Sequence, residues 1–341
     1  MPQSKRRLST RRPTVVLTDH PWPDVGIEHA ILAAAGYELV AGPTATATAA
    51  QVEAMIAAHD PVAIMTCWAQ VSAAAIRRST SLRVVARMGV GLDNIAVEAA
   101  TARGAWVTNV PDYCIEEVSD HVLALLLNAW RGIASFDREV KAGRWDPASA
   151  RLKRASERTV GIVGYGRIGS ASARKLAMGL RSRVLVTSPG LLASGQAGRE
   201  IASGIWACDL AEIQRTADAI VLHAPLTPAT RHLLDTRFLS ACQRQPLIVN
   251  VSRGGLIDSA ALLAALERGQ VSGAALDVVE GEPSPSPALV NRLDVTVTPH
   301  IAFSSDASIA ALCRSAADDV VRALRGEIPR NPCNSPSTAP E

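Results

Sequence analysis

The sequence predicts an α/β fold with two doubly wound units, each a largely parallel sheet covered by helices on both faces. Two observations support this prediction. Short apolar runs rich in β-branched residues alternate with helix-like segments along most of the chain, a rhythm typical of βαβ units. The chain also has 341 residues, which is more than one ordinary hydrophobic core accommodates, so two domains are expected.

The first part of the chain is expected to alternate strands and helices. Strands are predicted at Thr14–Thr18, Tyr37–Ala41, Val62–Thr66, Val84–Met88 and Trp106–Asn109, and helices at Ile27–Ala35, Gln51–Ala58 and Val71–Arg77. A longer helix follows from Ile115 to Arg131. Because Val122 to Leu127 within it is apolar almost all round, this helix should be buried on more than one side, by the second domain, by a second copy of the chain, or by both.

The stretch from Thr159 to Gly169 predicts a strand, a tight turn and the start of a helix. Gly164 suits the backbone angles of the turn, Gly166 would let a pyrophosphate approach the main chain, and Gly169 would let helix and strand pack closely. The phosphates would then meet the positive end of the helix dipole. A plain glycine turn is the alternative, but the flanking strand and helix favour a Rossmann-like dinucleotide site.

A second series of strands and helices follows this turn. Strands are predicted at Arg183–Thr187, Ala219–His223, Leu247–Ser252, Gly273–Val278 and Val295–Thr298, with a helix at Asp258–Arg268 among the segments between them. Polar residues from Asp146 to Arg158 are interpreted as a connection into the glycine turn. An amphipathic helix at Ala307–Arg325 precedes a Pro- and Ser-rich tail that we expect to be disordered.

The composition is that of a globular protein in water, with 48% hydrophobic and 20% charged residues. The net charge of +3 is too small to indicate a nucleic-acid partner, and much of the excess lies in one basic stretch, at Lys5, Arg6, Arg7, Arg11 and Arg12. An export signal is the alternative interpretation, but Asp19 interrupts the apolar run after this stretch. No run approaches the roughly 18 apolar residues that cross a bilayer, so no membrane partner is expected.

The six cysteines are far apart in the sequence and form no C-x-x-C pair. They are Cys67, Cys114, Cys208, Cys242, Cys313 and Cys333. This spacing favours reduced, mostly buried thiols in a cytoplasmic protein over a disulfide framework or a zinc site, and no metal is expected.

Residues just after the predicted strands are the candidates for chemistry, because ligands bind beyond the carboxyl ends of the strands in open parallel sheets. Arg253, Glu282 and His300 follow three of these strands. An imidazole titrates near neutral pH and could exchange a proton with a carbinol, while a guanidinium could grip a neighbouring carboxylate with two hydrogen bonds. Glu282 could pair with His300 and decide which ring nitrogen faces a substrate. Each residue also has a purely structural interpretation, as a helix cap or a solvated surface charge.

A glycine turn from Arg87 to Asn94 follows another predicted strand and would expose successive main-chain N–H groups, which can hold a small anion, although a simple loop explains it equally. Together with this turn, further segments carry a resemblance. They are Val163–Gly169, His223–Thr227, Asn250–Gly255, Ala275–Val279 with Gly281–Pro283, and Thr298–Ile301. The chain resembles the D-isomer-specific 2-hydroxyacid dehydrogenase family from about Thr14 to Asn331, nearly its whole length.

The resemblance implies hydride transfer between NAD(P) and the carbinol or carbonyl carbon of a small anionic substrate. Arg253 matches the family's substrate-binding arginine, Glu282 its acidic partner and His300 its acid/base. Val90 and Gly91 match the loop whose amides hold the substrate anion. The cofactor would be bound by Gly164, Gly166, Arg167, Ile168, Gly169, Ser188, His223, Ala224, Pro225, Val251, Ser252 and Asp277, with Asp277 facing the nicotinamide carboxamide.

The family also implies a discontinuous substrate domain, 1–108 with 303–341, and an inserted dinucleotide-binding domain, 109–302, with the active site in the cleft between them. The long apolar helix would support a homodimer. An acidic residue usually ends the second strand of the cofactor domain and bonds the adenosine ribose, but Ser188 occupies that position here. NADP is therefore an open alternative, since no carboxylate repels a 2′-phosphate. NAD is favoured, because Arg199 is the nearest downstream arginine and none follows at once.

A D-2-hydroxy acid or its 2-oxo acid is the favoured substrate. Arg253 and the amide turn require an anion without distinguishing a carboxylate from a phosphonate or phosphite, so oxidation of such a phosphorus oxyanion is the runner-up. Cys67 and Trp68 follow a strand of the substrate domain and would either line the pocket or pack in the core. A non-catalytic, NAD(H)-sensing dimer like the family's corepressors is the alternative from another class, and short tails without an added partner-binding region weigh against it.

Overall fold

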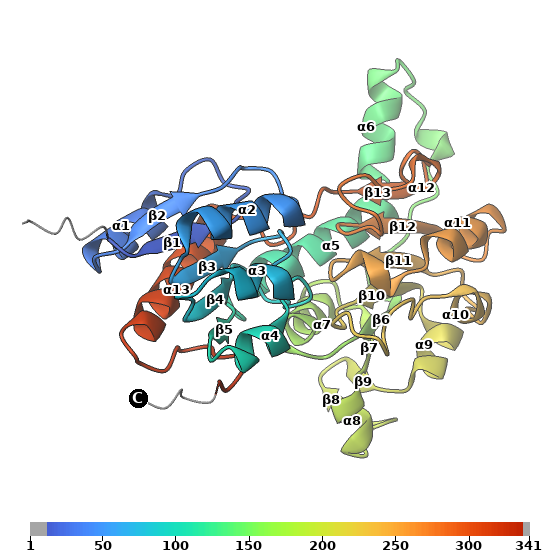
Figure 1. The fold of residues 1–341 in the computed structure, drawn as a ribbon. Coiled ribbons are helices and arrows are strands. Elements are labelled where there is room, and N and C mark those ends of the chain that lie inside the picture. Colours follow the sequence, from blue (N-terminus) through green and yellow to red (C-terminus); the bar gives the residue numbers. More distant parts are fainter. Residues whose placement is uncertain (1–11, 337–341) are drawn as a thin grey trace, which may run out of the picture. The chain divides into compact units, whose positions relative to one another are not determined.

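The computed structural model describes residues 12–336 and divides into two compact units (Figure 1). Unit 1 contains the chain up to Tyr113 together with the chain from Ser305 onward, and unit 2 is the continuous stretch Cys114–Ser304. Each unit contains its own largely parallel sheet with helices on both faces. The predicted α/β fold with two doubly wound, Rossmann-like units is therefore confirmed.

Unit 1 is built on a five-stranded parallel sheet in the order β2-β1-β3-β4-β5. Its strands are β1 (Thr14–Leu17), β2 (Glu38–Ala41), β3 (Ala63–Thr66), β4 (Val84–Arg87) and β5 (Trp106–Thr108). The central strands β1, β3 and β4 are buried along their whole length. This burial on both faces explains why their sequences are nearly continuous apolar runs, and all five predicted strands are confirmed.

Helices cover both faces of this sheet (Figure 1). They are α1 (Gly26–Ala34) and α13 (Asp306–Leu324) on one face, and α2 (Ala49–His59), α3 (Ala73–Arg78) and α4 (Val97–Ala102) on the other. Alternate strand residues supply the two cores, as the two-residue period of a strand requires. Leu17 and Met65 pack with α1 and α13, whereas Ile64 and Val85 pack with the other three helices.

Two predictions for unit 1 are wrong in part. The helix predicted from Val71 begins only at Ala73, because Ser72 caps it and Val71 forms a β-bridge with Ile95. The tail predicted to be disordered is bonded to β5 through residues up to Asn334. The amide of Cys333 donates to Val107 O at 2.7 Å, and Val107 N donates to Asn334 Oδ1 at 2.7 Å. The tail thus covers the free edge of β5, while residues 337–341 and the basic residues Lys5 to Arg11 lie outside the described chain.

Unit 2 is built on an eight-stranded sheet in the order β13-β12-β11-β10-β6-β7-β9-β8. The strands are β6 (Thr159–Val163), β7 (Arg183–Thr187), β8 (Glu200–Ala202), β9 (Ile205–Ala207), β10 (Ala219–Leu222), β11 (Leu247–Asn250), β12 (Gly273–Leu276) and β13 (Val295–Val297). Only β8 is antiparallel to its neighbour. The predicted strands of this region are confirmed, and the short hairpin β8–β9 is an addition that the sequence pattern does not indicate.

Two layers of helices enclose this sheet (Figure 1). They are α5 (Ile115–Arg131) and α7 (Arg167–Gly179) on one face, and α9 (Leu210–Thr216), α10 (Thr236–Ser240) and α11 (Ser259–Glu267) on the other, with the short α8 (Pro189–Ala193) and α12 (Pro287–Val290) in the connections. The helix predicted at Asp258–Arg268 is confirmed as α11, and Asp258 caps it by accepting from the amides of Ala260 and Ala261.

The long helix α5 is less buried than its sequence suggests. Its fully buried residues form one stripe, which includes Val118, Val122 and Leu126, while Ala124 and Ala129 are exposed. The expectation of burial on more than one side is therefore not met within the described chain. The stripe packs against α7 and against strands β11 and β12.

A segment that the sequence pattern does not predict extends from the end of α5. We call this segment, residues 132–158, the arm. Gly132, with φ +62°, ends α5, and α6 (Ile133–Lys141) then projects from the body of unit 2 (Figure 1). The chain returns through two 3-10 turns, Pro147–Ser149 and Ala155–Glu157, before it enters β6. The arm replaces part of the plain connection expected between 146 and 158.

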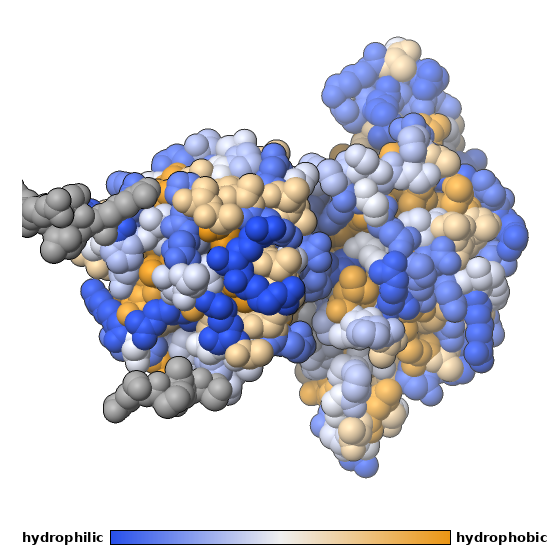
Figure 2. Space-filling model, in the orientation of Figure 1, coloured by the Kyte–Doolittle hydropathy of each residue, from blue (hydrophilic) through white to orange (hydrophobic). Residues whose placement is uncertain are grey.

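The visible surface of each unit is mixed in polarity (Figure 2). Figure 2 shows hydrophilic side chains interspersed with hydrophobic ones over the visible face of each unit. All six cysteines are free thiols, and burial raises the pKa of Cys67 to about 12 and those of Cys208 and Cys242 to about 11. Among residues 12–336, no helix is both long enough and apolar enough to cross a membrane.

Candidate active site in unit 2

The predicted site residues of unit 2 gather along one edge of its sheet. Strands β13, β12, β11, β10, β6 and β7 are consecutive in the sheet and mutually parallel, so their carboxyl ends lie at the same edge. The segments that follow these strands carry His300, Glu282, Arg253, His223–Pro225, Gly164–Gly169 and Ser188, in that order along the edge. Residues up to 136 positions apart in sequence are thus brought to one line by the parallel topology.

A hydrogen bond joins His300 to Glu282 at this edge. The Nδ1 atom of His300 lies 3.0 Å from Oε1 of Glu282. Because an ionised carboxylate only accepts hydrogen bonds, Nδ1 carries the proton and Nε2 is the basic nitrogen of the neutral ring. The Glu282 backbone is folded back on the same turn, since its amide donates to Val279 O at 3.2 Å. The pair is the arrangement that general acid–base chemistry requires.

The Arg253 segment is packed directly against the segment that leads to Glu282. A Cβ added to Gly254 would lie 2.3 Å from the carbonyl carbon of Val279, so only glycine permits this approach. Two side chains also hold the segment. Asn250 donates from Nδ2 to Arg253 O at 2.9 Å, and Ser252 donates from Oγ to the carbonyl of Ala224 at 2.6 Å, which joins the ends of β11 and β10. The Arg253 guanidinium donates to Ser252 O through Nη1 at 2.8 Å.

The glycine turn after β6 has the geometry of a phosphate cradle. Gly164 has φ +103°, and a Cβ there would lie 2.5 Å from the carbonyl carbon of His223. A Cβ on Gly169 would lie 2.1 Å from Gly164 O, so helix and strand touch at this point. Gly166, in contrast, has no atom within 4 Å of its Cβ position and is exposed. It immediately precedes α7, where Arg167 and Ile168 form the first turn. A pyrophosphate fits this open, amide-rich position.

His223 lies beside the same turn. Its amide donates to Val163 O at 2.7 Å, and its Nε2 atom is buried with no hydrogen-bond partner in the described chain. Burial lowers the pKa of His223 to about 4, so the ring is neutral at physiological pH. Ala224 is buried, and the carbonyl of Pro225 accepts a bond from Thr230 Oγ1 at 2.6 Å. An orphaned buried nitrogen next to an open glycine is compatible with a bound ligand that supplies its partner.

Ser188 and Arg199 are placed at the end of the sheet edge. Ser188 caps α8, and its hydroxyl accepts from the amide of Leu191 at 3.4 Å. Arg199 precedes the antiparallel strand β8, and its carbonyl accepts from Ala207 N at 2.9 Å. Because β9 runs parallel to β7, with Ala207 beside Val186, Arg199 stands at the same edge as Ser188, two strands away. The sequence alone leaves the course of this arginine undefined.

Val251 and Asp277 are both buried. The carboxylate of Asp277 is already engaged by the protein. It accepts from the hydroxyl of Thr298 and from two main-chain amides, those of Ile301 and Ala302. Sequence reasoning missed these contacts, because nothing in the spacing of residues 277 and 298–302 indicates them.

The predicted anion-binding turn belongs to unit 1 and presents amides. All four carbonyl groups from Met88 to Gly91 accept hydrogen bonds, two of them from the buried Arg87, one from Val110 N and one from Asn109 Nδ2. In the part of the chain that the structure describes, the amides of Val90 and Gly91 have no protein acceptor. The carbonyls are thus turned into the protein and the N–H groups are left for a ligand, as in anion-binding nests.

Asp19 and Asn94 are further unit 1 residues that sequence reasoning missed. The fully buried Asp19 accepts from the amides of Cys67, Trp68 and Ala69 at 3.1, 2.9 and 3.1 Å. Asn94, in the amide-presenting turn, donates to the carbonyls of Cys67 and Ala69. The loops after β3 and β4 are therefore tied together. Cys67 packs in the core, while Trp68 is half-buried.

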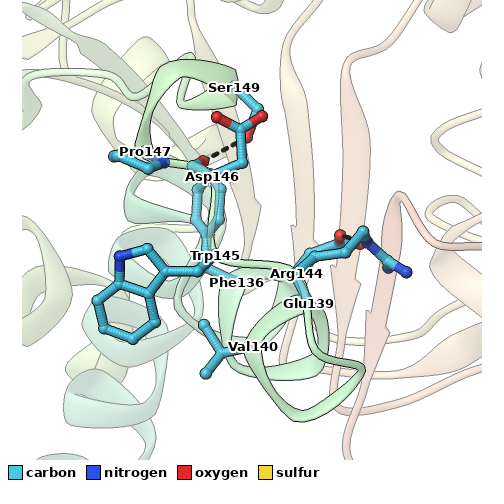
Figure 3. Close-up of a pocket in the computed structure, with 8 residues that line it drawn as sticks. All are labelled: Phe136, Glu139, Val140, Arg144, Trp145, Asp146, Pro147 and Ser149. Carbon is cyan, nitrogen blue, oxygen red and sulfur yellow. Dashed lines mark hydrogen bonds and ion pairs between the residues drawn. The ribbon is translucent and has the colours of Figure 1, made fainter.

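A groove on the arm of unit 2 is separate from this edge. It encloses about 300 Å³ and is lined by Phe136, Glu139, Val140, Arg144, Trp145, Asp146, Pro147 and Ser149 (Figure 3). His121 of α5 contacts Thr298 and Asn128 contacts Thr296, so α5 runs opposite to β13 and ends toward the amino ends of the strands. The arm follows from that end.

Among residues 12–336, no group of His, Cys, Asp and Glu side chains is arranged to hold a metal ion.

Comparison with known proteins identifies the family of this chain. The family described as D-isomer specific 2-hydroxyacid dehydrogenase, NAD binding domain, matches residues 123–302. A chloroplastic D-3-phosphoglycerate dehydrogenase of Arabidopsis thaliana is 36% identical over 261 residues, which cover 76% of this chain and 41% of that protein. The glyoxylate reductase of Pyrococcus furiosus is 36% identical over 255 residues, which cover 73% of this chain and 74% of that protein.

A solved structure is similar over almost the entire chain. It is an NADPH-dependent glyoxylate/hydroxypyruvate reductase of Sinorhizobium meliloti in complex with NADP and malonate, which is 29% identical, with a TM-score of 0.80 and coverage of 97% of this chain and all of that one. This chain spans less than half of the plant relative but all of the bacterial structure. The chain belongs to the D-isomer-specific 2-hydroxyacid dehydrogenase family.

Proposed function

We propose that this protein is an NAD(P)-dependent dehydrogenase that transfers a hydride between nicotinamide and the carbinol or carbonyl carbon of a small anionic substrate, a D-2-hydroxy acid or 2-oxo acid. One observation carries the proposal. The His300–Glu282 pair stands at the same sheet edge as Arg253 and the glycine cradle after β6. An acid/base, an anion-binding fork and a dinucleotide site together meet the needs of this reaction.

The chain's own residues have distinct tasks in this proposal. Nε2 of His300 takes the hydroxyl proton as a 2-hydroxy acid is oxidised and returns it in the reverse direction. Glu282, bonded at Nδ1, stabilises the imidazolium that forms. Arg253 holds the substrate carboxylate with its planar fork. The bound dinucleotide supplies the hydride acceptor or donor.

The cofactor site comprises the sheet edge from β7 to β12. Its proposed contacts are Gly164, Gly166, Arg167, Ile168, Gly169, Ser188, His223, Ala224, Pro225, Val251, Ser252 and Asp277. The open Gly166 and the first turn of α7 receive the pyrophosphate, and the cradle around Gly164 and Gly169 supports this assignment. NAD is the favoured cofactor. NADP is also compatible, because Ser188 carries no charge that would repel a 2′-phosphate.

Unit 2, with predicted limits of 109–302, is the proposed cofactor domain, and unit 1, with predicted limits of 1–108 and 303–341, is the proposed substrate domain. The unsatisfied amides of Val90 and Gly91 support the second assignment, since they would share the substrate anion with Arg253. The protein is proposed to act in the cytoplasm, without nucleic-acid or membrane partners.

We further propose a homodimer that involves α5 and the arm. Large apolar side chains on the arm are exposed, most of all Trp145, which is 83% accessible beside the groove that it helps to line. Sedimentation velocity tests this proposal. Trp145→Glu should shift the protein from dimer to monomer, whereas Ile328→Glu, at an exposed isoleucine of unit 1, should not. A monomeric wild type, or equal effects of both variants, would contradict it.

Absorbance at the reduced-nicotinamide band tests the activity. The protein is mixed with NADH or NADPH and a panel of 2-oxo acids, and with NAD or NADP and a panel of 2-hydroxy acids and phosphorus oxyanions. Turnover of a D-2-hydroxy acid or 2-oxo acid is expected. Turnover of phosphite or phosphonate alone would move the substrate to that class. Tight cofactor binding without any turnover would favour a nucleotide-sensing dimer instead.

A further inference from the structure

Asp277 accepts four hydrogen bonds from the loop that carries His300. Its main-chain carbonyl accepts from the amide of His300 at 2.8 Å. Its carboxylate accepts from the next two amides, Ile301 at 2.9 Å through Oδ1 and Ala302 at 2.9 Å through Oδ2, and from the hydroxyl of Thr298 at 2.5 Å. Asp277 is 2% accessible, so these contacts are shielded from water. One buried side chain therefore defines the course of residues 298–302.

The conformation of His300 shows why such a constraint is needed. His300 has φ +54°, in the left-handed region that residues with a Cβ avoid unless the surroundings impose it. The hydrogen bonds from Asp277 to the residues on both sides of His300 impose this conformation. The imidazole direction depends on it, because the side chain projects from the backbone of this one residue.

The contacts continue from this loop to helix α5. Nε2 of His121 lies 3.1 Å from Oγ1 of Thr298 and 3.7 Å from Oδ1 of Asp277. The single hydroxyl proton of Thr298 is donated to the carboxylate, so Thr298 Oγ1 must accept from Nε2–H of His121. The three side chains thus form a directional chain from His121 through Thr298 to Asp277. Chains of this kind polarise one another and hold their members in one geometry.

We propose that His121, Thr298 and Asp277 form a brace that sets the position of the His300 imidazole, with His121 and Thr298 as positioning residues. The inference rests on the proposed function, in that it assumes His300 to be the acid/base. It adds a role for α5, whose residues the predicted site does not include. The reacting nitrogen of His300 must be placed to within a fraction of an ångström, and the brace supplies that placement from helix α5.

A neighbouring contact between α5 and the same strand region does not involve Asp277. Asn128, two turns further along α5, donates from Nδ2 to Oγ1 of Thr296 at 3.3 Å. Thr296 and Thr298 thus belong to the same strand region and both bond α5, but only Thr298 bonds Asp277. Thr296 is therefore a matched control at which the same chemical change leaves the His300 loop untouched.

The experiment compares Thr298→Val, Thr298→Ser and Thr296→Val in the full chain. Valine keeps the shape of threonine and removes the hydroxyl, and serine keeps the hydroxyl. Thr298→Val should lower kcat about 10- to 100-fold while the Kd for NADH, measured by its fluorescence, stays within about twofold. Thr298→Ser should recover most of the loss, and Thr296→Val should behave as the wild type. Equal kcat values for Thr298→Val and Thr296→Val would overturn the proposal.

A second readout does not depend on turnover. In protein labelled with ¹³C at histidine Cε1, the His300 signal is identified by its absence in His300→Gln. This signal should shift or broaden in Thr298→Val and remain in place in Thr296→Val. An unmoved His300 signal in Thr298→Val would overturn the brace. A wild type that turns over no substrate, with the signal displaced as expected, would refute the dehydrogenase proposal and leave the brace standing.

Discussion

Lowering the pH from 7 to 5 should reduce the free energy of unfolding, in part through His223. Replacing His223 with a residue that does not titrate should remove the part of this reduction that His223 causes. Burial lowers the pKa of His223 from 6.5 to about 4, because the imidazolium loses its hydration beside the glycine turn. Between these two values the unfolded chain binds a proton that the folded chain does not. Protons therefore favour unfolding, and the free energy of unfolding falls as the pH falls from about 6.5 towards 4.

The two pKa values set the size of the effect. At pH 7 the imidazole is mostly neutral in both the folded and the unfolded state, and its lowered pKa reduces the free energy of unfolding by only about 0.2 kcal/mol. At pH 5 the imidazole is almost fully protonated in the unfolded state and mostly neutral in the folded state. The free energy of unfolding is then reduced by about 2 kcal/mol. Nε2 of His223 is buried, but the residue as a whole is only half-buried. Solvent that reaches the ring weakens the desolvation that lowers the pKa, so the change in the free energy of unfolding is smaller. We expect about 1 to 2 kcal/mol.

Urea unfolding followed by circular dichroism measures this effect in the wild type, His223→Leu and His29→Gln at both pH values. Leucine fills a similar space without titrating, and His29 is an exposed histidine of unit 1 that serves as the control. Between pH 7 and pH 5, the wild type and His29→Gln should lose about 1 to 2 kcal/mol more than His223→Leu. Equal losses in all three proteins would refute the reasoning, because the pKa of His223 would then not be lowered by folding.

Four further predictions concern the proposed active site. His300→Ala should lower kcat by about two to four orders of magnitude while the Kd for NADH stays nearly unchanged, and equal losses of rate and binding would contradict the acid/base role. Arg253→Lys should raise KM for the 2-oxo acid by about tenfold or more in steady-state assays, because a point charge replaces a fork, and an unchanged KM would place the anion elsewhere. Ser188→Asp should lower kcat/KM with NADPH by about tenfold or more and spare NADH, because the new carboxylate repels a 2′-phosphate. Arg199→Ala should weaken NADPH alone if this arginine reaches the phosphate, and equal effects on both cofactors would exclude that contact.

The sequence predicts those elements whose signal is local. The central strands of both units are buried on two faces, so runs such as Val160–Val163 and Ala219–Leu222 stand out as apolar and β-branched. The turn after β6 is marked by glycines, because a Cβ at Gly164 or Gly169 would collide with the backbone. The alignment of His300, Glu282 and Arg253 at one edge also follows from local information, since parallel strands end together.

Elements that depend on distant contacts are not predicted. Helix α6 buries no side chain, so it adds nothing to the core pattern from which helices are recognised. Strands β8 and β9 have three residues each, too few for a periodic signal. The pairing of Cys333 and Asn334 with β5 joins residues more than 200 positions apart. The bonds from Asp277 to the His300 loop are tertiary contacts of the same kind, and the sequence therefore suggests a cofactor contact and misses the brace.

The two-part composition of unit 1 has a consequence for biosynthesis. Helix α13 supplies Leu312, Ala316 and Val320 to the core on one face of the β1–β5 sheet, and it is translated after the whole of unit 2. On the ribosome, residues 114–304 emerge as an uninterrupted stretch and can fold while α1 is the only helix available for that face of the earlier sheet. A nascent chain that has not yet reached residue 306 therefore exposes the part of the face that α13 covers, on β3, β4 and β5, and this is the stage at which chaperones compete with aggregation.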